Sequence, residues 1–300
     1  MFKTRLISGI VLIVIALFVL WIGGAVTGAV TMILSAIGVY EFCRVYDIEK
    51  RSPTVIALIW TFVYYLVLIL ADMRTSIITK IDPSVKAAVE SGETVSLTKF
   101  TIPIMILYLL AILTLYVFRF PKYHDREIMA AFTSFFYVSV MLSFVYKLRT
   151  MYEGGYFIVL VFICSWGNDT LAYCAGRLFG KHKMSPELSP KKTVEGLIGG
   201  IVGSGLLGVI YAFFLKGRVE QFDNMNIYIT LFIVCALGAI PAVIGDLAAS
   251  AIKRNNNVKD YGTLIPGHGG VLDRFDSMIF TAPIIYYLIQ FVITTQQNSL

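Results

Sequence analysis

The chain has 300 residues, of which 57% are hydrophobic and 15% are charged, and its mean hydropathy is +0.77. Soluble domains carry about 25% charged residues, so the composition excludes an ordinary soluble domain and predicts an all-α, polytopic membrane protein. The formal net charge of +6 is interpreted as a topology and lipid-headgroup signal, and no nucleic-acid partner is expected. The four cysteines and three histidines are dispersed, which indicates neither disulfides nor a zinc site.

Apolar runs long enough to cross a hydrocarbon core of about 30 Å recur along the chain. The first follows Lys3 and Arg5 and is interpreted as an uncleaved span. Nine spans are predicted, at 5–23, 25–46, 54–72, 101–118, 127–148, 156–178, 194–215, 225–252 and 277–295. Residues 1–125 are expected to form an N-terminal membrane region with spans one to four and an extracytoplasmic loop at 73–100. Residues 126–300 are expected to form a C-terminal membrane region that carries the polar motifs.

Lysine and arginine gather on one predicted side of the membrane. With the N-terminus placed in the cytoplasm, 17 of the 25 Lys and Arg residues fall in cytoplasmic segments. The positive-inside rule therefore predicts a cytoplasmic N-terminus and, with nine spans, an extracytoplasmic C-terminus. Two motif-bearing loops, 179–193 and 253–276, then face the cytoplasm. No internal repeat is evident, whereas many secondary transporters carry one.

The sixth predicted span holds polar residues within an apolar run, in the string SWGNDTLAYCAGRLFGK. Asn168 and Asp169 lie well inside it, and Tyr173 shares a helix face with Asp169. One interpretation is a polar cluster that joins helices within the membrane. The other is one wall of a binding cavity.

Two lysines stand directly before the seventh predicted span. Lys191 and Lys192 precede Thr193, a predicted N-cap, and Glu195 follows in the first turn of the expected helix. A helix N-terminus behind two lysines favours an anionic group. A solvated basic loop is the alternative.

An acid lies near the cytoplasmic end of the eighth predicted span. Asp246, Ser250 and Lys253 fall at i, i+4 and i+7, so a helix places them on one face. A carboxylate in a span costs about 2.5–3.5 kcal/mol unless it is paired, hydrated or metal-bound. A simple ion pair with Lys253 or Arg254 is the alternative to a functional role. Three residues are expected to loosen this helix: Gly238, Pro241 and Gly245.

The segment 250–276 concentrates charge around a glycine-rich turn, SAIKRNNNVKDYGTLIPGHGGVLDRFD. Gly267, Gly269 and Gly270 can expose consecutive backbone N–H groups to a phosphate oxygen. His268 can donate to the same oxygens or make only a hydrogen bond within the turn. Asp273 follows the turn. Two carboxylates, Asp246 and Asp273, together with substrate phosphates are a usual set of magnesium ligands.

These motifs resemble the signature of the phosphatidate cytidylyltransferase family, also called CDP-diglyceride synthases. The NDTLAY and SPKKTVEG strings are also similar to segments of that family, and the resemblance covers about 156–295. The signature positions are matched by Ser250, Lys253, Arg254, Lys259, Asp260, Gly262, Pro266, His268, Gly269, Gly270, Asp273, Arg274 and Asp276.

The resemblance implies transfer of CMP from CTP to phosphatidate, which gives CDP-diacylglycerol and pyrophosphate. It also implies magnesium, a second cation such as K⁺, a homodimer, and a multi-pass cell-membrane protein whose active site faces the cytoplasm. The metal carboxylates carry over to Asp246 and Asp273, and catalytic roles are expected for these two with Lys253 and Arg274. Substrate-binding roles are expected for Asn168, Asp169, Tyr173, Lys191, Lys192, Ser250, Arg254, Lys259, Asp260, His268, Gly269, Gly270 and Asp276.

Two other functions stay open at this point. Another CTP-dependent membrane lipid enzyme, such as a polyprenol kinase or an archaeal-type lipid cytidylyltransferase, would use similar phosphate chemistry. An ion-coupled transporter would explain intramembrane acids such as Asp169 and Asp246. It would also need charged residues on both sides of the membrane, whereas the charged motifs gather on one predicted side.

Overall fold

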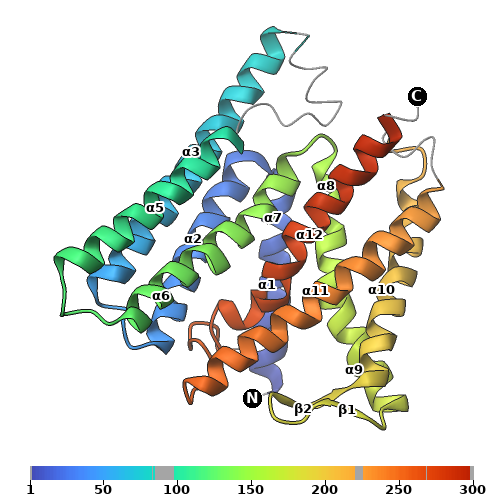
Figure 1. Cartoon of the computed structure of the whole chain (residues 1–300). Coiled ribbons are helices and arrows are strands. Elements are labelled where there is room, and N and C mark those ends of the chain that lie inside the picture. The colour runs from blue at the N-terminus through green and yellow to red at the C-terminus, as the bar shows by residue number, and fades with distance from the viewer. Residues whose placement is uncertain (1, 83, 85–97, 220–225, 268, 298–300) are drawn as a thin grey trace. The chain divides into compact units, whose positions relative to one another are not determined.

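The computed structural model describes residues 2–82, 84, 98–219, 226–267 and 269–297, and Figure 1 traces the chain. Among the described residues, eight helices are long and apolar enough to cross a membrane. They correspond in order to the second through ninth predicted spans. The first predicted span falls on a further helix, with a shorter apolar stretch at Ile13–Ile22. The prediction of an all-α, polytopic membrane protein is confirmed.

The helices follow the predicted order closely because each long apolar run must satisfy its own backbone groups. The first half contains α1 (Phe2–Ile22), α2 (Gly24–Val45), α3 (Ser52–Ile81), α5 (Thr98–Phe118), α6 (Asp125–Ser134) and α7 (Met141–Thr150). The second half contains α8 (Gly154–Phe162), α9 (Asn168–Phe179), α10 (Val194–Leu215), α11 (Ile227–Asn255) and α12 (Leu272–Gln297).

The structure differs from the prediction at three places. Helix α3 continues through residues 73–81 of the predicted loop, and residues 83 and 85–97 of that loop lie outside the described residues. The fifth and sixth spans each contain a π-helical turn, η1 (Phe135–Val140) and η2 (Ile163–Gly167). The predicted loop between α9 and α10 contains an antiparallel hairpin of β1 (Lys183–Ser185) and β2 (Ser189–Thr193).

The chain forms two compact units, each described here by itself. The first unit comprises residues 1–152 and 256–274, and the second comprises 153–255 and 275–300. The predicted division of the sequence into regions 1–125 and 126–300 groups the spans in chain order, and it stays a prediction.

Hydroxyl pairs join the helices of the first unit. Ser35 pairs with Tyr65 at 2.8 Å, and Thr61 pairs with Ser139 at 2.7 Å. All four side chains are buried. Such interhelical hydrogen bonds replace the hydrophobic force that lipid cannot supply between helices.

Glycines allow close helix contacts in the second unit. A Cβ at Gly203 of α10 would come within 2.7 Å of Leu171 on α9, and one at Gly208 would come within 2.6 Å of the Leu231 carbonyl on α11. Small residues at such crossings let helix backbones approach each other. Helix α10 is therefore held closely against the two helices that carry Asp169 and Asp246.

Candidate functional site

In the second unit, a lysine of the hairpin lies against an aspartate of α11. Lys192 on β2 forms an ion pair with Asp246, and the two side chains are 26% and 27% exposed. Asp276, buried on α12, lies within electrostatic reach of Asp246, Asp169 and Lys253. Sequence segments separated by tens of residues thus contribute three acids and two lysines to one charged cluster. We call these five residues, Asp169, Lys192, Asp246, Lys253 and Asp276, the charged cluster.

Helix α11 presents Asp246, Ser250 and Lys253 as the spacing predicted, because the helix is continuous from Ile227 to Asn255. Lys253 is buried and Ser250 is half-buried. The helix passes without a break through the three residues expected to loosen it, Gly238, Pro241 and Gly245. Gly245 instead gives room to α12: a Cβ there would come within 2.7 Å of the Asp276 carbonyl oxygen. This close approach brings Asp276 towards the helix that carries Asp246.

Asn168 is fully buried at the start of α9, directly after the π-helical turn η2. Its amide oxygen lies against Gly200 of α10, where a Cβ would collide with it. Neither amide atom has a hydrogen-bond partner among the described residues. Its neighbours Asp169 and Tyr173 are exposed. Asn168 therefore packs against α10 without a hydrogen bond to the described residues, and its contact with substrate stays a prediction. Asp169 belongs to the charged cluster.

The hairpin places the two predicted lysines differently. Lys191 is exposed, whereas its neighbour Lys192 is half-buried and paired with Asp246. The predicted N-cap is confirmed, because the Thr193 hydroxyl oxygen accepts a hydrogen bond from the Gly196 N–H at 3.1 Å. The solvated-loop alternative therefore does not describe Lys192.

In the first unit, the glycine-rich turn folds around the carboxylate of Asp273. The N–H groups of Tyr261 and Gly270 donate to Asp273 Oδ2 at 2.8 and 2.9 Å. Gly269 has a φ of +87°, a conformation that L side chains rarely adopt, and a Cβ there would come within 2.8 Å of the same oxygen. The expectation that the Gly270 N–H points at a phosphate is corrected, since Asp273 accepts from it. His268 lies outside the described residues.

A second carboxylate, Glu41 near the end of α2, supports the same turn and was missed by sequence reasoning. Glu41 is 4% exposed. Its two oxygens accept from the N–H groups of Val271 and Leu272 at 3.0 and 2.9 Å, at the start of α12. A Cβ at Gly262 or Gly270 would collide with this carboxylate. The sequence feature that could have indicated this role is a glutamate close to the end of an apolar run.

Four of the predicted site residues lie on the surface of the unit to which each belongs. Arg254 ends α11 in the second unit, and Lys259, Asp260 and Arg274 belong to the first unit. All four are exposed, which suits contacts with a charged substrate. Their contacts with substrate stay predictions, as do those of Tyr173, Ser250 and Gly269.

The predicted magnesium ligands lie in different compact units. Asp246 belongs to the second unit and Asp273 to the first, so their joint binding of a metal stays a prediction. Within the described ranges, no group of three or more His, Cys, Asp or Glu side chains is arranged to hold a metal ion. Magnesium commonly uses one or two carboxylates and takes its other ligands from phosphates and water. The oxygen donors of Asp246 and its acidic neighbours therefore fit such a partial site.

Residues 3–292 match the cytidylyltransferase family. Three similar relatives carry the name phosphatidate cytidylyltransferase. The first, from Staphylococcus haemolyticus strain JCSC1435, is 41% identical over 160 residues, which is 53% of this chain and 59% of the relative. The second, from Staphylococcus saprophyticus, is 39% identical over the same length and shares. The third, from Staphylococcus aureus strain COL, is 40% identical over 153 residues, 51% of this chain and 55% of the relative. The chain thus spans somewhat over half the length of the curated relatives it matches.

Proposed function

This chain belongs to the cytidylyltransferase family, and we propose that it transfers CMP from CTP to phosphatidate, producing CDP-diacylglycerol and pyrophosphate. The observation that carries the proposal is the charged cluster. In this cluster Lys192 forms an ion pair with Asp246, and Asp276 interacts electrostatically with Asp246, Asp169 and Lys253. Lys192, Lys253 and Asp276 lie at or near the ends of helices long enough to span a membrane, and Asp169 and Asp246 lie within such helices. A site of this kind suits a lipid and a nucleotide that both carry phosphates.

The reaction is a nucleotidyl transfer at the α-phosphorus of CTP. An oxygen of the phosphatidate phosphate forms a bond to that phosphorus, and the bond to the bridging oxygen of the pyrophosphate breaks. The pyrophosphate leaves with the bonding electron pair. The phosphatidate phosphate is already ionised near neutral pH, so this step needs no general base. The protein contributes positioning and charge neutralisation.

Basic side chains of the site would hold the two phosphate-bearing substrates. In the second unit, Lys192 and Lys253 lie among carboxylates, which orient their ammonium groups, and Arg254 and Lys191 are exposed. In the first unit, the Asp273 and Glu41 carboxylates shape the turn that carries Lys259 and Arg274. Charge-assisted hydrogen bonds to phosphate are about twice as strong as neutral ones, so these groups favour bound CTP and the departing pyrophosphate.

The proposed cofactor is magnesium, with Asp246 and Asp273 as its carboxylate ligands. When bound, it would supply positive charge to the α-phosphate and to the leaving pyrophosphate. Asp169 and Asp276 would add negative potential that favours a divalent cation near Asp246. A second cation such as K⁺ and assembly as a homodimer are proposed on the family resemblance.

We propose that the protein resides in the cell membrane with its active site facing the cytoplasm. The support is the excess of Lys and Arg in the segments assigned to that side, 17 of 25. CTP would reach the charged cluster from the cytoplasm. Phosphatidate would enter from the lipid, with its acyl chains along the apolar helices.

The direct test is product formation by the purified protein. Supplied with CTP, phosphatidate and Mg²⁺ in lipid nanodiscs, the protein is expected to release one pyrophosphate for each CDP-diacylglycerol formed, and chelation of Mg²⁺ with EDTA is expected to stop both. A folded, metal-replete preparation that forms neither product would refute the proposed function.

A further inference from the structure

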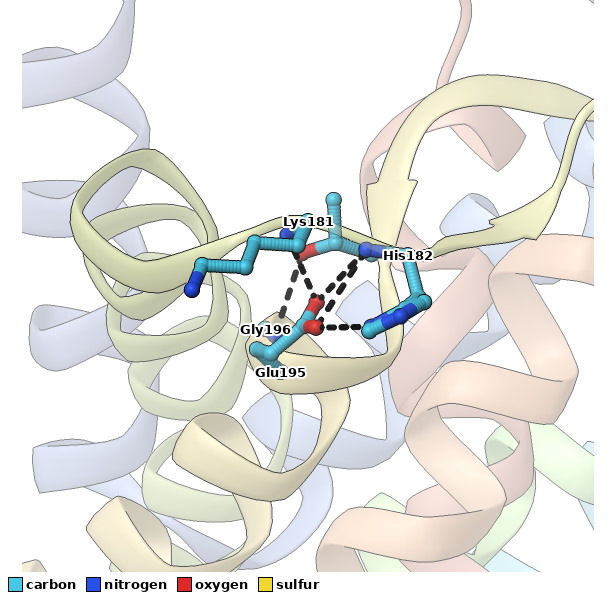
Figure 2. Close-up of polar contacts among 5 residues, drawn as sticks. Lys181, His182, Glu195 and Gly196 are labelled. Carbon is cyan, nitrogen blue, oxygen red and sulfur yellow. Dashed lines mark hydrogen bonds and ion pairs between the residues drawn. The ribbon is translucent and has the colours of Figure 1, made fainter.

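Glu195 ties together the two ends of the hairpin that carries Lys192 (Figure 2). The Glu195 carboxylate accepts from the backbone N–H of Lys181 at 3.1 Å and from that of His182 at 3.2 Å. One of its oxygens also lies 2.6 Å from Nδ1 of the His182 ring. The chain just before β1 is thereby tied to the first turn of α10, just after β2. We call these contacts of Lys181, His182 and Glu195 the clasp.

The hairpin needs such an external support. Its short strands pair Lys183 with Thr193 and Ser185 with Ser189, with an irregularity between these pairs. An isolated two-stranded hairpin is marginally stable at best in water. One backbone bond, from the Val194 N–H to the His182 carbonyl oxygen at 2.9 Å, extends the pairing towards α10. The clasp adds three donors at that same end, which fixes the hairpin to the helix.

Lys192 lies between the two fixed points of this segment. The clasp residue Glu195 follows it by three positions, and the Lys192 ammonium is held at its other end by Asp246. Thr193, the adjacent residue, is buried and caps α10. Loss of the clasp would free the strand that carries Lys192, while the cap and the rest of α10 would remain.

We propose that Glu195, through His182 and the hairpin, is a positioning residue that holds Lys192 over Asp246 for binding of the CTP phosphates. This inference rests on the proposed function for its readout in CTP binding. The clasp lies outside the predicted site residues. Glu195 needs no contact with substrate for this role, because it acts through the backbone of the segment that it closes.

The test measures CMP transfer by Glu195→Ala and Lys192→Ala, singly and combined. We expect Glu195→Ala to raise KM for CTP about tenfold and to change kcat little. Removing a residue that orients a metal ligand typically costs about 10–100-fold in metal affinity or activity, and we expect an effect at the lower end of that range here. In the Lys192→Ala background the same change should alter KM by less than about twofold, because coupled residues are not additive. A tenfold effect in both backgrounds would show that Glu195 acts independently of Lys192 and would overturn the proposal.

Three further variants separate positioning from general destabilisation. Glu187→Ala removes an exposed carboxylate from the tip of the same hairpin and should leave KM unchanged. Glu195→Gln keeps an acceptor oxygen and should recover part of the loss. His182→Ala removes only the ring contact and should have a smaller effect than Glu195→Ala. A loss of equal size in Glu187→Ala would assign the effect to the hairpin as a whole and contradict a specific clasp.

A second measurement needs no catalytic activity. Trypsin should cut the hairpin after Lys191 or Lys192 about tenfold faster in Glu195→Ala than in wild type, since local opening exposes the strand to cleavage. Glu187→Ala should be cut at the wild-type rate. Equal rates in Glu195→Ala and wild type would refute the clasp even if the proposed function holds. If wild type forms no CDP-diacylglycerol, that result refutes the proposed function, and the cleavage rates still decide whether the clasp holds the hairpin.

Discussion

Asp246→Asn is expected to lower kcat for CMP transfer by roughly 10²–10³-fold, the range seen when one group that stabilises transition-state charge is removed. Asp246 is paired with Lys192 and lies in a cluster with Asp169 and Asp276. The substitution removes a charge that we propose binds magnesium, and it should leave the helix intact. The amide that replaces the Asp246 carboxylate can still accept a hydrogen bond from the Lys192 ammonium, so KM for CTP should change less than kcat. Steady-state rates at saturating Mg²⁺, with pyrophosphate release as the signal, measure both.

The fold should survive this substitution. The Lys192–Asp246 pair is partly exposed, and such pairs contribute about 0–1 kcal/mol to stability. Asp125→Asn makes the same chemical change at an exposed position at the start of α6 and should have wild-type activity. Near-wild-type turnover by Asp246→Asn, in protein with an unchanged melting temperature, would remove Asp246 from the reaction.

Glu41→Ala is expected to disrupt the glycine-rich turn and to abolish activity. The Glu41 carboxylate accepts from two backbone N–H groups at the start of α12. Each buried donor left without an acceptor costs about 1–3 kcal/mol, so we expect a loss of roughly 2–6 kcal/mol in the free energy of unfolding. The measurement is the melting temperature of the detergent-solubilised protein beside its CMP-transfer rate.

Two companion variants make this result specific. Glu41→Gln keeps one acceptor oxygen, so its loss should be smaller than that of Glu41→Ala. Glu49→Ala removes a partly exposed carboxylate just beyond α2 and should leave both the melting temperature and the rate unchanged. If Glu41→Ala melts and turns over like wild type, the turn does not depend on Glu41.

The two predicted metal carboxylates now differ in what their replacement should do. Asp273 is buried, and one of its oxygens accepts from the N–H groups of Tyr261 and Gly270. Its removal therefore disturbs the turn as well as any metal site. Asp246 instead makes an ion pair with the Lys192 side chain. Asp246 is consequently the cleaner position at which to test metal binding.

Most of the fold could be predicted from hydropathy, because lipid forces each apolar run to be a helix. The seventh span is correct to the residue at 194–215, and the others are displaced by only a few positions apart from the extension of α3. The spacing of Asp246, Ser250 and Lys253 also predicted their common face, since α11 is continuous. Which residues share a helix face depends only on their spacing within one helix, so the sequence is sufficient to predict it.

The tertiary contacts of the site could not be read from spacing. Glu41 reaches Val271 across 230 positions of the chain, and Lys192 reaches Asp246 from a hairpin that has too few residues to give a strand pattern. Gly262 and Gly270 could be recognised as glycines in a turn. The Glu41 carboxylate lies against both positions and leaves no room for a side chain. This reason for the two glycines depends on how α2 packs in the first unit.

The position of the transferred label is the most direct measurement of the proposed reaction. Purified protein in nanodiscs with phosphatidate and Mg²⁺ is given CTP labelled with ³²P at either the α- or the γ-phosphate. Transfer of CMP predicts that the α-label enters the lipid and that the γ-label leaves in pyrophosphate. Entry of the γ-label into lipid, with CDP as the other product, would identify a kinase and contradict a cytidylyltransferase.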